Sequence, residues 1–442
     1  MSELMIGFGG LLALLVLLGM RTPVGTAMLA VGIVGMWIIH PSGERAVAAT
    51  VAGAAFHISS EMALTILPLF ILMGNLAGVS GMTRDVYSAA HAWLGHMRGG
   101  LASSTILGCA GFSALTGSSL ACAVTMGRVA LPEMKRYGYD DALATGTVAA
   151  GGTLGILIPP SAGFVIYAIL TEQSIARLFL AGVIPGAILA SLFILAIWWR
   201  VRRNPKLAPS LANPAPMRER IASLGRAGWF MGVLFLSIGG IYTGVFSAIE
   251  AAGIGAFLSF VVCLVRRSLT WSALREALAN TLQSTATAFY IIIGAFVFTP
   301  FIARTGLPAT VTQAIIDTGA SPMAVLVICL LALTVLGMFM DGFAILVLTL
   351  PILQPLMESY GFDMVWFGVL MVIVLEMGLI SPPVGINVFV VKSIAPPEVS
   401  LNTIFRGIWP FWFAMLALIV LLLLFPQLAL FMPQSMYGVS IT

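Results

Sequence analysis

The chain has 442 residues, of which 60% are hydrophobic and only 9% are charged, and its mean hydropathy is +1.06. A water-soluble domain cannot cover its surface with so few charged side chains, so the composition excludes a soluble globular protein. The net charge of +4 at pH 7 does not indicate a nucleic-acid partner, because the basic residues are confined to loops between apolar runs. Many of these runs reach the roughly 17–25 residues that span a bilayer, which predicts an all-α polytopic membrane protein.

The first half contains five predicted spans and one re-entrant hairpin. The spans fall near 4–20, 24–40, 56–80, 141–170 and 177–199. We interpret the first run as a retained span and not a signal peptide, because it begins without basic residues and carries Glu3. A Gly- and Ser-rich segment over 101–132 has basic residues on both flanks. Such flanks predict a helical hairpin that enters and leaves on one side, with its tip at Leu115–Ala121.

The second half repeats this plan after a basic linker over 200–226. The predicted spans lie near 228–243, 248–265, 280–302, 363–392 and 404–431. A second hairpin over 323–357 has its tip at Phe339–Phe343, with the sequence FMDGF. The segment 270–280 carries Trp271 and Arg275, and we expect it to lie along the membrane interface as an amphipathic helix.

An internal repeat with a constant offset of 223 residues (Pro159 to Pro382) relates the two halves. The motif GILIPPSAG in the first half corresponds to GLISPPVGI in the second. Six pairs match in order at this offset: Pro132 with Pro355, Gly138 with Gly361, Asp140 with Asp363, Gly155 with Gly378, Pro159 with Pro382 and Pro160 with Pro383. At the same offset the tip residue Ser118 falls on Asp341. Internal repeats in a hydrophobic chain are typical of transporters.

The basic residues orient these repeats in the membrane. With the linker in the cytoplasm, counting crossings places 17 of the 21 basic residues on that side, as the positive-inside rule requires. Five crossings per half make the repeats inverted and put both termini in the periplasm. We therefore expect a first repeat over 1–199, a cytoplasmic linker over 200–226 and a second repeat over 227–442. The first hairpin would open from the cytoplasm and the second from the periplasm.

The Pro-Pro pairs predict breaks inside the spans 141–170 and 363–392, because proline removes a backbone donor and clashes with the preceding turn. Irregular backbone at membrane depth is tolerated only inside protein or beside a wet cavity. Its free carbonyls suit Na⁺, and half-helix N-termini attract anions. One such pair alone could be a simple kink, but two matched copies, each with a hairpin, argue for a central site made of two halves.

The motifs that carry these features resemble the large membrane subunit of tripartite ATP-independent periplasmic (TRAP) transporters, a DctM-like permease. They are RTPVG at Arg21, LPLFILMGNLAGVSG at Leu67, TGSS at Thr116, GGTLGILIPPS at Gly151, GMFMDG at Gly337 and EMGLISPPVGINVFV at Glu376. The resemblance implies a non-enzymatic, elevator-type symporter of the bacterial inner membrane. It would import a carboxylate-bearing organic acid with Na⁺ as the coupling ion and no cofactor.

The resemblance also implies partners and site residues. The partners would be a soluble periplasmic binding protein that delivers the solute and a small four-helix membrane subunit. The candidate Na⁺ ligands carried over from the family lie near Ser118, Ser119, Gly155 and Pro159 in one site, and near Asp341, Gly342, Gly378 and Pro382 in the other. Weaker candidates for solute binding are Thr116, Ser161 and Asn387. Glu376, before the second break, would hold unwound backbone or bind a cation.

Other classes fit the sequence less well. An intramembrane protease would need a serine with a histidine in a span, or a second membrane aspartate beside Asp341, and neither is evident. A channel could share inverted repeats, and saturable Na⁺-dependent uptake would separate a carrier from it. A stand-alone Na⁺/dicarboxylate symporter of related fold is the closest alternative. The four cysteines, Cys109, Cys122, Cys263 and Cys329, lack metal-ligand spacing, so no metal beyond Na⁺ is expected.

Overall fold

The computed structural model describes residues 2–209 and 214–437, and over these residues it contains twenty α-helices, two short 3₁₀-helices and no strands. Eight segments are long and apolar enough to cross a membrane, and five further apolar helices are shorter. This content agrees with the predicted polytopic membrane protein. Ser210, in the predicted linker, lies outside the described residues.

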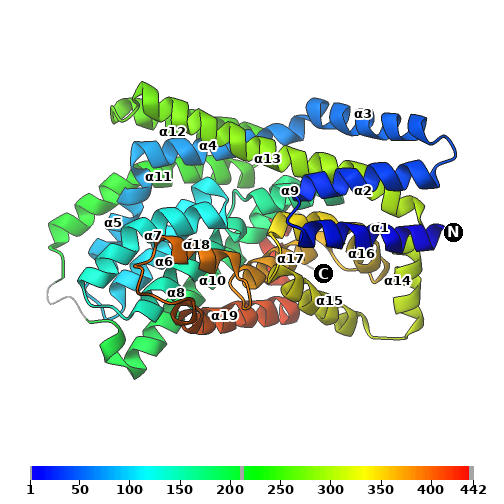
Figure 1. Ribbon diagram of the computed structural model, residues 1–442. Coiled ribbons are helices and arrows are strands. Elements are labelled where there is room, and N and C mark those ends of the chain that lie inside the picture. Colours follow the sequence, from blue (N-terminus) through cyan, green and yellow to red (C-terminus); the bar gives the residue numbers. More distant parts are fainter. Residues whose placement is uncertain (1, 210–213, 438–442) are drawn as a thin grey trace.

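The first half of the chain contains ten α-helices (Figure 1). They are α1 (Glu3–Gly19), α2 (Val24–Ile39), α3 (Glu44–Ser60), α4 (Ile66–Ser80), α5 (Met82–Leu94), α6 (Gly100–Thr116), α7 (Ser119–Arg136), α8 (Asp141–Leu157), α9 (Ala162–Thr171) and α10 (Ile175–Arg203). The 3₁₀-helix η1 (Met62–Thr65) connects α3 to α4.

The second half contains the other ten α-helices, preceded by the 3₁₀-helix η2 (Pro205–Leu207). They are α11 (Met217–Tyr242), α12 (Ala248–Val265), α13 (Trp271–Arg304), α14 (Leu307–Asp317), α15 (Pro322–Gly337), α16 (Gly342–Ser359), α17 (Met364–Leu379), α18 (Ile386–Ile394), α19 (Leu401–Leu424) and α20 (Gln427–Tyr437).

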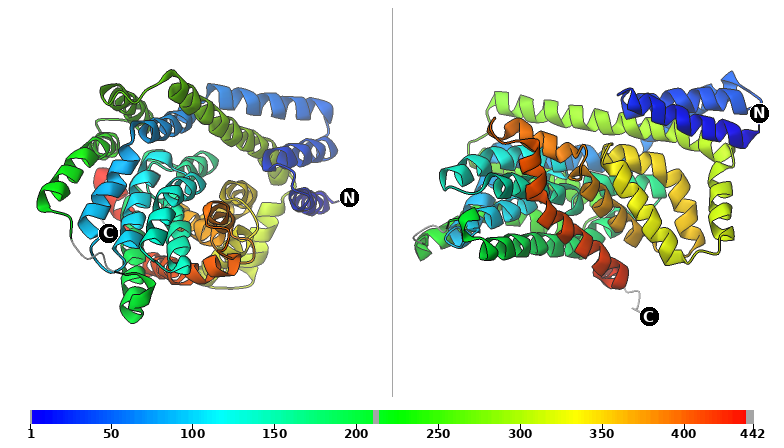
Figure 2. Two further views of the ribbon diagram at one scale, coloured as in Figure 1. Left: turned by 60° about the vertical axis from the view of Figure 1, so that its left-hand side comes forward. Right: turned by 60° about the horizontal axis from the view of Figure 1, so that its bottom comes forward.

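The helices form an outer layer and an inner bundle. The long helix α13 runs along one edge of the molecule, where it packs against α2, α3 and α4, while α12 packs against α4 (Figure 1). Both views of Figure 2 keep the blue helices α1–α3 beside this green helix. The inner bundle is built around α8 and α17, and every residue of α17 is buried. Both of these central helices end directly before a Pro-Pro break.

Capping residues explain where the two central helices begin. Asp140 accepts a hydrogen bond from Leu143 N (2.9 Å), and Asp363 accepts one from Val365 N (2.8 Å). Such N-caps satisfy donors that lack a partner within the helix. Two residues before each aspartate, Gly138 and Gly361 have φ of 72° and 75°, which glycine adopts without steric cost. Both helices therefore start with the same local geometry.

Three predicted segments differ from the observed helices. The span expected at 56–80 is interrupted at Glu61, whose extended backbone ends α3 and whose side chain caps η1 by accepting from Ala63 N, while Pro68 cannot donate to Leu64 O. The segment 270–280 is not a separate interfacial helix; it forms the start of the 34-residue α13, which has no helix-breaking residue there. The last span, 404–431, breaks at Pro426 into α19 and α20 for the same reason as the first.

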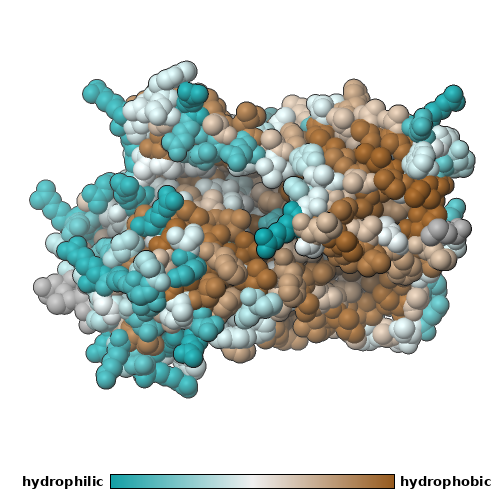
Figure 3. Space-filling model, viewed as in Figure 1, coloured by the Kyte–Doolittle hydropathy of each residue, from teal (hydrophilic) through white to brown (hydrophobic). Residues whose placement is uncertain are grey.

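The predicted linker is also shorter than expected, because α10 and α11 extend into it and leave only 204–216 between them. Polar residues gather at one end of the molecule (left in Figure 3), whereas apolar residues cover the middle and the opposite end. Basic residues at the end of α10 stack on neighbouring tryptophans, with Arg202 over Trp198 and Arg203 over Trp199. This division of the surface is the pattern of a membrane-embedded body with a hydrated basic end.

Candidate functional site

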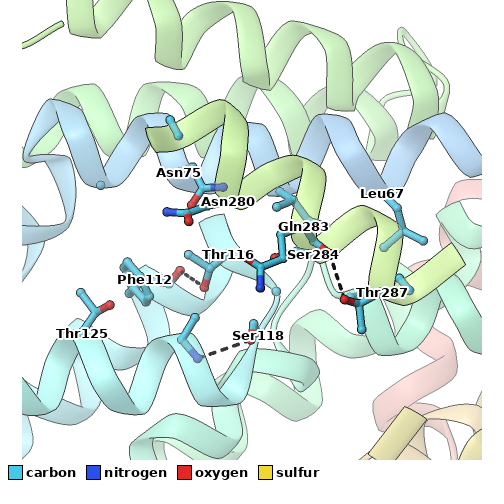
Figure 4. Close-up of a pocket in the computed structure, with 18 of the residues that line it drawn as sticks. Leu67, Asn75, Phe112, Thr116, Ser118, Thr125, Asn280, Gln283, Ser284 and Thr287 are labelled. Atoms are coloured by element: carbon cyan, nitrogen blue, oxygen red, sulfur yellow. Dashed lines mark hydrogen bonds between the residues drawn. The ribbon is translucent and has the colours of Figure 1, made fainter. Parts of the chain in front are cut away.

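A cavity of about 680 Å³ lies between the outer layer and the first hairpin, with α4 and α13 on one side and the tip between α6 and α7 on the other (Figure 4). We call this cavity the cleft. Its polar lining residues are Asn75, Thr116, Ser118, Thr125, Glu276, Asn280, Gln283, Ser284 and Thr287. Among the described residues that line it, Glu276 is the only ionisable one. The cleft is therefore polar but holds no side-chain cation in this part of the chain.

The α13 wall of the cleft was missed by sequence reasoning. Glu276, Asn280, Gln283 and Thr287 recur at helical spacing, so that one face of α13 is polar within an otherwise apolar helix. This periodicity was present in the sequence and could have identified the wall. On the neighbouring helix α4, Asn75 Nδ2 donates to Thr281 Oγ1 at 2.9 Å, which holds the two walls of the outer layer together.

Three helix N-termini face the cleft. Ser118 is the N-cap of α7, and its side chain accepts from Ala121 N at 3.4 Å. Ala162 is the first residue of α9, Phe343 is the second residue of α16, and both line the cavity. The N-terminus of a helix carries a partial positive charge, which attracts anions, although side chains already cap these three ends and Glu276 adds a negative charge to the lining of the cleft.

The first hairpin tip closes tightly onto the first break. Gly117 has a left-handed φ of 59°, and its carbonyl accepts from Ala162 N at 3.5 Å. A Cβ placed on Gly155 would lie 2.6 Å from both Ser118 C and Ser119 N, so the backbone of α8 is in direct contact with the backbone of the tip. Pro159 is buried in the same break. The structure thus gathers the predicted residues Ser118, Ser119 and Gly155.

The second hairpin tip is packed differently from the first. Asp341 is the N-cap of α16, and its Oδ2 accepts from Phe343 N at 3.1 Å. A Cβ on Gly378 would lie 2.5 Å from Gly337 Cα, so Gly378 packs on the last residue of α15. A Cβ on Gly342 would find its nearest atom, Leu375 Cβ, at 3.9 Å. Pro382 is exposed, so the second set of predicted residues is not gathered as the first is.

A buried carboxylate connects the two halves. Ser119 Oγ at the first tip donates to Glu376 Oε1 on α17 at 2.6 Å, across 257 positions of sequence. Glu376 is 1% exposed, and its Oε2 has no hydrogen-bond partner among the described residues. Asn387, at 0% exposure, likewise has neither amide atom paired within the described chain. Burying a polar atom without a hydrogen-bond partner costs free energy, so these atoms indicate a further binding partner.

The three weaker candidates for solute binding occupy different places. Thr116 lines the cleft, and its hydroxyl donates to Phe112 O at 3.1 Å. Ser161 is buried as the N-cap of α9, where it accepts from Phe164 N at 3.3 Å. Asn387 is buried in α18 and is not one of the residues that line the cleft. Only Thr116 is therefore placed to contact a solute in this conformation.

The described residues contain no cluster of three or more His, Cys, Asp or Glu side chains that could hold a metal ion. Cys109, Cys122 and Cys263 are buried, Cys329 is partly buried, and all four are free thiols. The hard oxygen donors at the tips and breaks, namely hydroxyls, carboxylates and backbone carbonyls, are of the kind that alkali and alkaline-earth cations prefer.

Comparison with known proteins gives a consistent result. Residues 11–428 match the family model described as "Tripartite ATP-independent periplasmic transporter, DctM component". The chain is 34% identical to the C4-dicarboxylate TRAP transporter large permease protein DctM of Pseudomonas aeruginosa, over 86% of this chain and 88% of that one. It is 30% identical to the sialic acid TRAP transporter large permease protein SiaM of Vibrio cholerae, over 97% of this chain and 99% of that one.

A solved structure shares the fold at low sequence identity. The YdaH transporter of Alcanivorax borkumensis superposes with a TM-score of 0.63 and 16% identity, covering 91% of this chain and 90% of that one. The likeness extends over nearly the whole chain, so the helical architecture as a whole is shared and not only one hairpin.

Proposed function

The chain belongs to the family of large permease components of TRAP transporters, and is thus a multi-pass bacterial inner-membrane transport protein and not an enzyme; from this premise we propose that it imports a carboxylate-bearing solute together with Na⁺. The observation that carries the proposal is the cleft, where residues at the N-termini of α7, α9 and α16 line one cavity whose single ionisable residue in the described lining, Glu276, lies on the α13 wall. The partial positive charge of these N-termini favours a carboxylate.

The solute class follows from the same cleft and from the relatives. A volume of about 680 Å³ accommodates a small organic acid, with the amides of Asn280 and Gln283 and the hydroxyls of Thr116 and Thr287 as hydrogen-bonding partners. The relatives named above carry C4-dicarboxylates and sialic acid, which are both carboxylates. We propose C4-dicarboxylates as the first solutes to test, because the more similar of these two relatives carries them.

Na⁺ coupling is supported by the unpaired oxygens near the tips. Glu376 Oε2 and Asn387 Oδ1 are buried acceptors without a hydrogen-bond partner in the described chain. Oxygens of this kind can coordinate a cation. We assign one Na⁺ to the first tip and break, with Ser118, Ser119, Gly155 and Pro159. We assign the other to the second tip and break, with Asp341, Gly342, Gly378 and Pro382. In this role the protein holds the ions by oxygen ligands, and their release to the cytoplasm makes import directional.

We propose that each half is one of two inverted repeats, 1–199 and 227–442, and that the inner bundle moves as one body in an elevator mechanism. Matched caps at Asp140 and Asp363 support the repeat. Interlocking of the two halves supports a single moving body: Tyr167 on α9 donates to Met364 O at 2.6 Å, and α8 meets α19 at a glycine contact. The outer layer of α2, α4, α12 and α13 would stay fixed as the scaffold.

The family description also supports two partners. Because the family is described as the DctM component of a tripartite periplasmic transporter, we propose that this chain works with a periplasmic binding protein and a small membrane subunit. These partners separate it from a stand-alone Na⁺/dicarboxylate symporter of related fold, which would transport without them.

The test is uptake of radiolabelled succinate into proteoliposomes that contain this chain and its small subunit, with the binding protein outside. We expect uptake that requires an inward Na⁺ gradient and the binding protein, and that saturates with succinate. The same assay with fumarate and with sialic acid tests which other carboxylates are transported. Uptake of succinate that is equally fast with K⁺ in place of Na⁺ would contradict the coupling, and uptake without the binding protein would favour the stand-alone symporter.

A further inference from the structure

One contact between the outer layer and the inner bundle has no side chain in it. Gly74 on α4 faces the end of α6, just before the tip of the first hairpin. A Cβ built on Gly74 would lie 2.4 Å from Leu115 O, 2.9 Å from Thr116 Cα and 3.0 Å from Leu115 C. All three are backbone atoms, so no rotamer change could make room for the extra carbon.

The helix that carries Gly74 is fixed on its other faces. Asn75 bonds to Thr281 of α13, and Leu76 O accepts from Cys263 Sγ of α12 at 3.1 Å. The residue before Gly74, Met73, packs closely on Gly255 of α12. A Cβ built on Gly255 would lie 2.5 Å from Met73 Sδ. The residues on both sides of Gly74 therefore tie α4 to the outer layer, and α4 cannot back away from the hairpin without breaking these contacts.

We propose that Gly74 is the docking point at which the scaffold receives the first hairpin when the cleft is open, a positioning role that rests on the proposed elevator motion. The hairpin backbone at Leu115–Thr116 reaches its place beside the cleft only because residue 74 has no side chain. A methyl group at this position makes the docked arrangement less stable and favours the arrangements in which the hairpin has moved away. Gly74 therefore sets the balance between the two ends of the transport cycle.

The chain supplies two matched controls. Gly78 lies one turn further along α4 and also lines the cleft, but among the described residues no atom lies within 4 Å of a Cβ built there. A Cβ on Gly255 would lie 2.5 Å from Met73 Sδ on α4 and 2.7 Å from Ser237 Oγ on α11, so this position is also close-packed, but its neighbours are side chains outside the hairpin. Gly78→Ala therefore controls for the extra methyl on α4, and Gly255→Ala controls for overpacking that does not touch the hairpin.

The experiment measures the separation of the two bodies directly. Spin labels at Ala121→Cys on α7 and Asn280→Cys on α13, both exposed positions that line the cleft, report their distance in nanodiscs by pulsed electron resonance. The partly buried Cys329 is replaced by serine, and the three buried native cysteines do not compete for label. The label–label distance of this structure defines the docked population. Gly74→Ala should lower the ratio of docked to undocked protein by about tenfold, because overpacking a close contact by one methyl group destabilises it by an amount of this order.

Gly78→Ala and Gly255→Ala should leave this distance distribution unchanged, while Gly255→Ala lowers the melting temperature. Succinate uptake should fall about tenfold in Gly74→Ala and should be unchanged in Gly255→Ala, which does not line the cleft. A Gly74→Ala distribution equal to that of the parent overturns the proposal, and so does an equal shift in Gly255→Ala. If the parent protein fails to take up succinate but Gly74→Ala still shifts the distances, the docking role stands and only the proposed transport function fails.

Discussion

The two hairpin tips are related by the repeat offset, yet they stand differently toward their breaks. The first tip lies against its break through the backbone of Ser118, Ser119 and Gly155. The second tip contacts α15 and α16, and its break at Pro382 is exposed. Matched motifs have thus produced two differently packed breaks within the same molecule.

A single residue accounts for part of this difference. Ser161 follows the first Pro-Pro pair and caps α9, so only 158–161 is irregular. At the matched position the second break has Val384, which offers no capping oxygen, and α18 begins only after Gly385 (φ 63°), so that 380–385 is irregular. A Pro-Pro pair therefore interrupts a helix, and the residue that follows the pair determines how soon the next helix begins.

The largest expected effect comes from filling the closed contact. Gly155→Ala places a carbon 2.6 Å from the backbone of the first tip, so we expect loss of uptake and a melting temperature lower by several degrees. Gly342→Ala at the second tip is the control for thermal stability, since its nearest atom is 3.9 Å away. Thermal unfolding in detergent and Na⁺-dependent uptake measure both variants. Equal effects of the two substitutions would show that the tips are not differently packed.

The next effect concerns charge at the two tips. Asp341→Asn keeps a capping side chain on α16 but removes the carboxylate, so the fold should persist while the Na⁺ concentration for half-maximal uptake rises at least about tenfold, or uptake is lost. Ser118→Ala removes a neutral cap and should cost stability of about 1 kcal/mol with a smaller change in Na⁺ dependence. Unchanged Na⁺ dependence in Asp341→Asn would remove Asp341 from the ligands.

A third effect lies in the link between the halves. Glu376→Gln and Ser119→Ala, alone and combined, form a double-mutant cycle on the 2.6 Å hydrogen bond. Because an intramolecular hydrogen bond contributes about 0.5–1.5 kcal/mol, the thermal stabilities should be coupled by an amount in that range. Additive effects of the two substitutions would indicate that the first tip and α17 are energetically independent.

The smallest effect is expected at the second break. Trp412 Nε1 donates to Ser381 Oγ at 2.9 Å, and Ser381 in turn donates to Met377 O at 2.6 Å, so the indole holds the start of the irregular segment. Trp412→Phe should lower stability by about 1 kcal/mol. Trp409→Phe, on the same helix with a 45% exposed side chain, is the control and should behave as the parent. A larger loss in Trp409→Phe than in Trp412→Phe would contradict this role.

The sequence was sufficient for the local features of this site. The proline pairs predicted the breaks, and the Gly- and Ser-rich segment 101–132 with its basic flanks predicted the first pair of helices around a tip. The internal repeat predicted the second pair, over 323–357. The α13 wall of the cleft and the contact of Ser119 with Glu376 were not predicted. Both depend on which helix faces which, and a contact across 257 positions leaves no periodic trace in the chain.

The interruption at Pro68 shows a different kind of failure. Hydropathy alone joined 56–80 into one span, although the proline and Glu61 together provide a helix stop and a new start. In the same way, the apolar content at 280–302 hid the polar stripe on α13, because the stripe occupies only one face of the helix. Local backbone rules were more informative here than mean hydropathy.

The central claim is that the first hairpin moves against the outer layer. Cysteines at Gly78→Cys on α4 and Ala121→Cys on α7 line opposite sides of the cleft, and a reducible bifunctional reagent can join them. We predict that the crosslinked protein loses succinate uptake, retains Na⁺ binding because the tips are undistorted, and recovers uptake when the link is reduced. A crosslinked protein that transports at the full rate would contradict the moving-bundle account and favour a local gate.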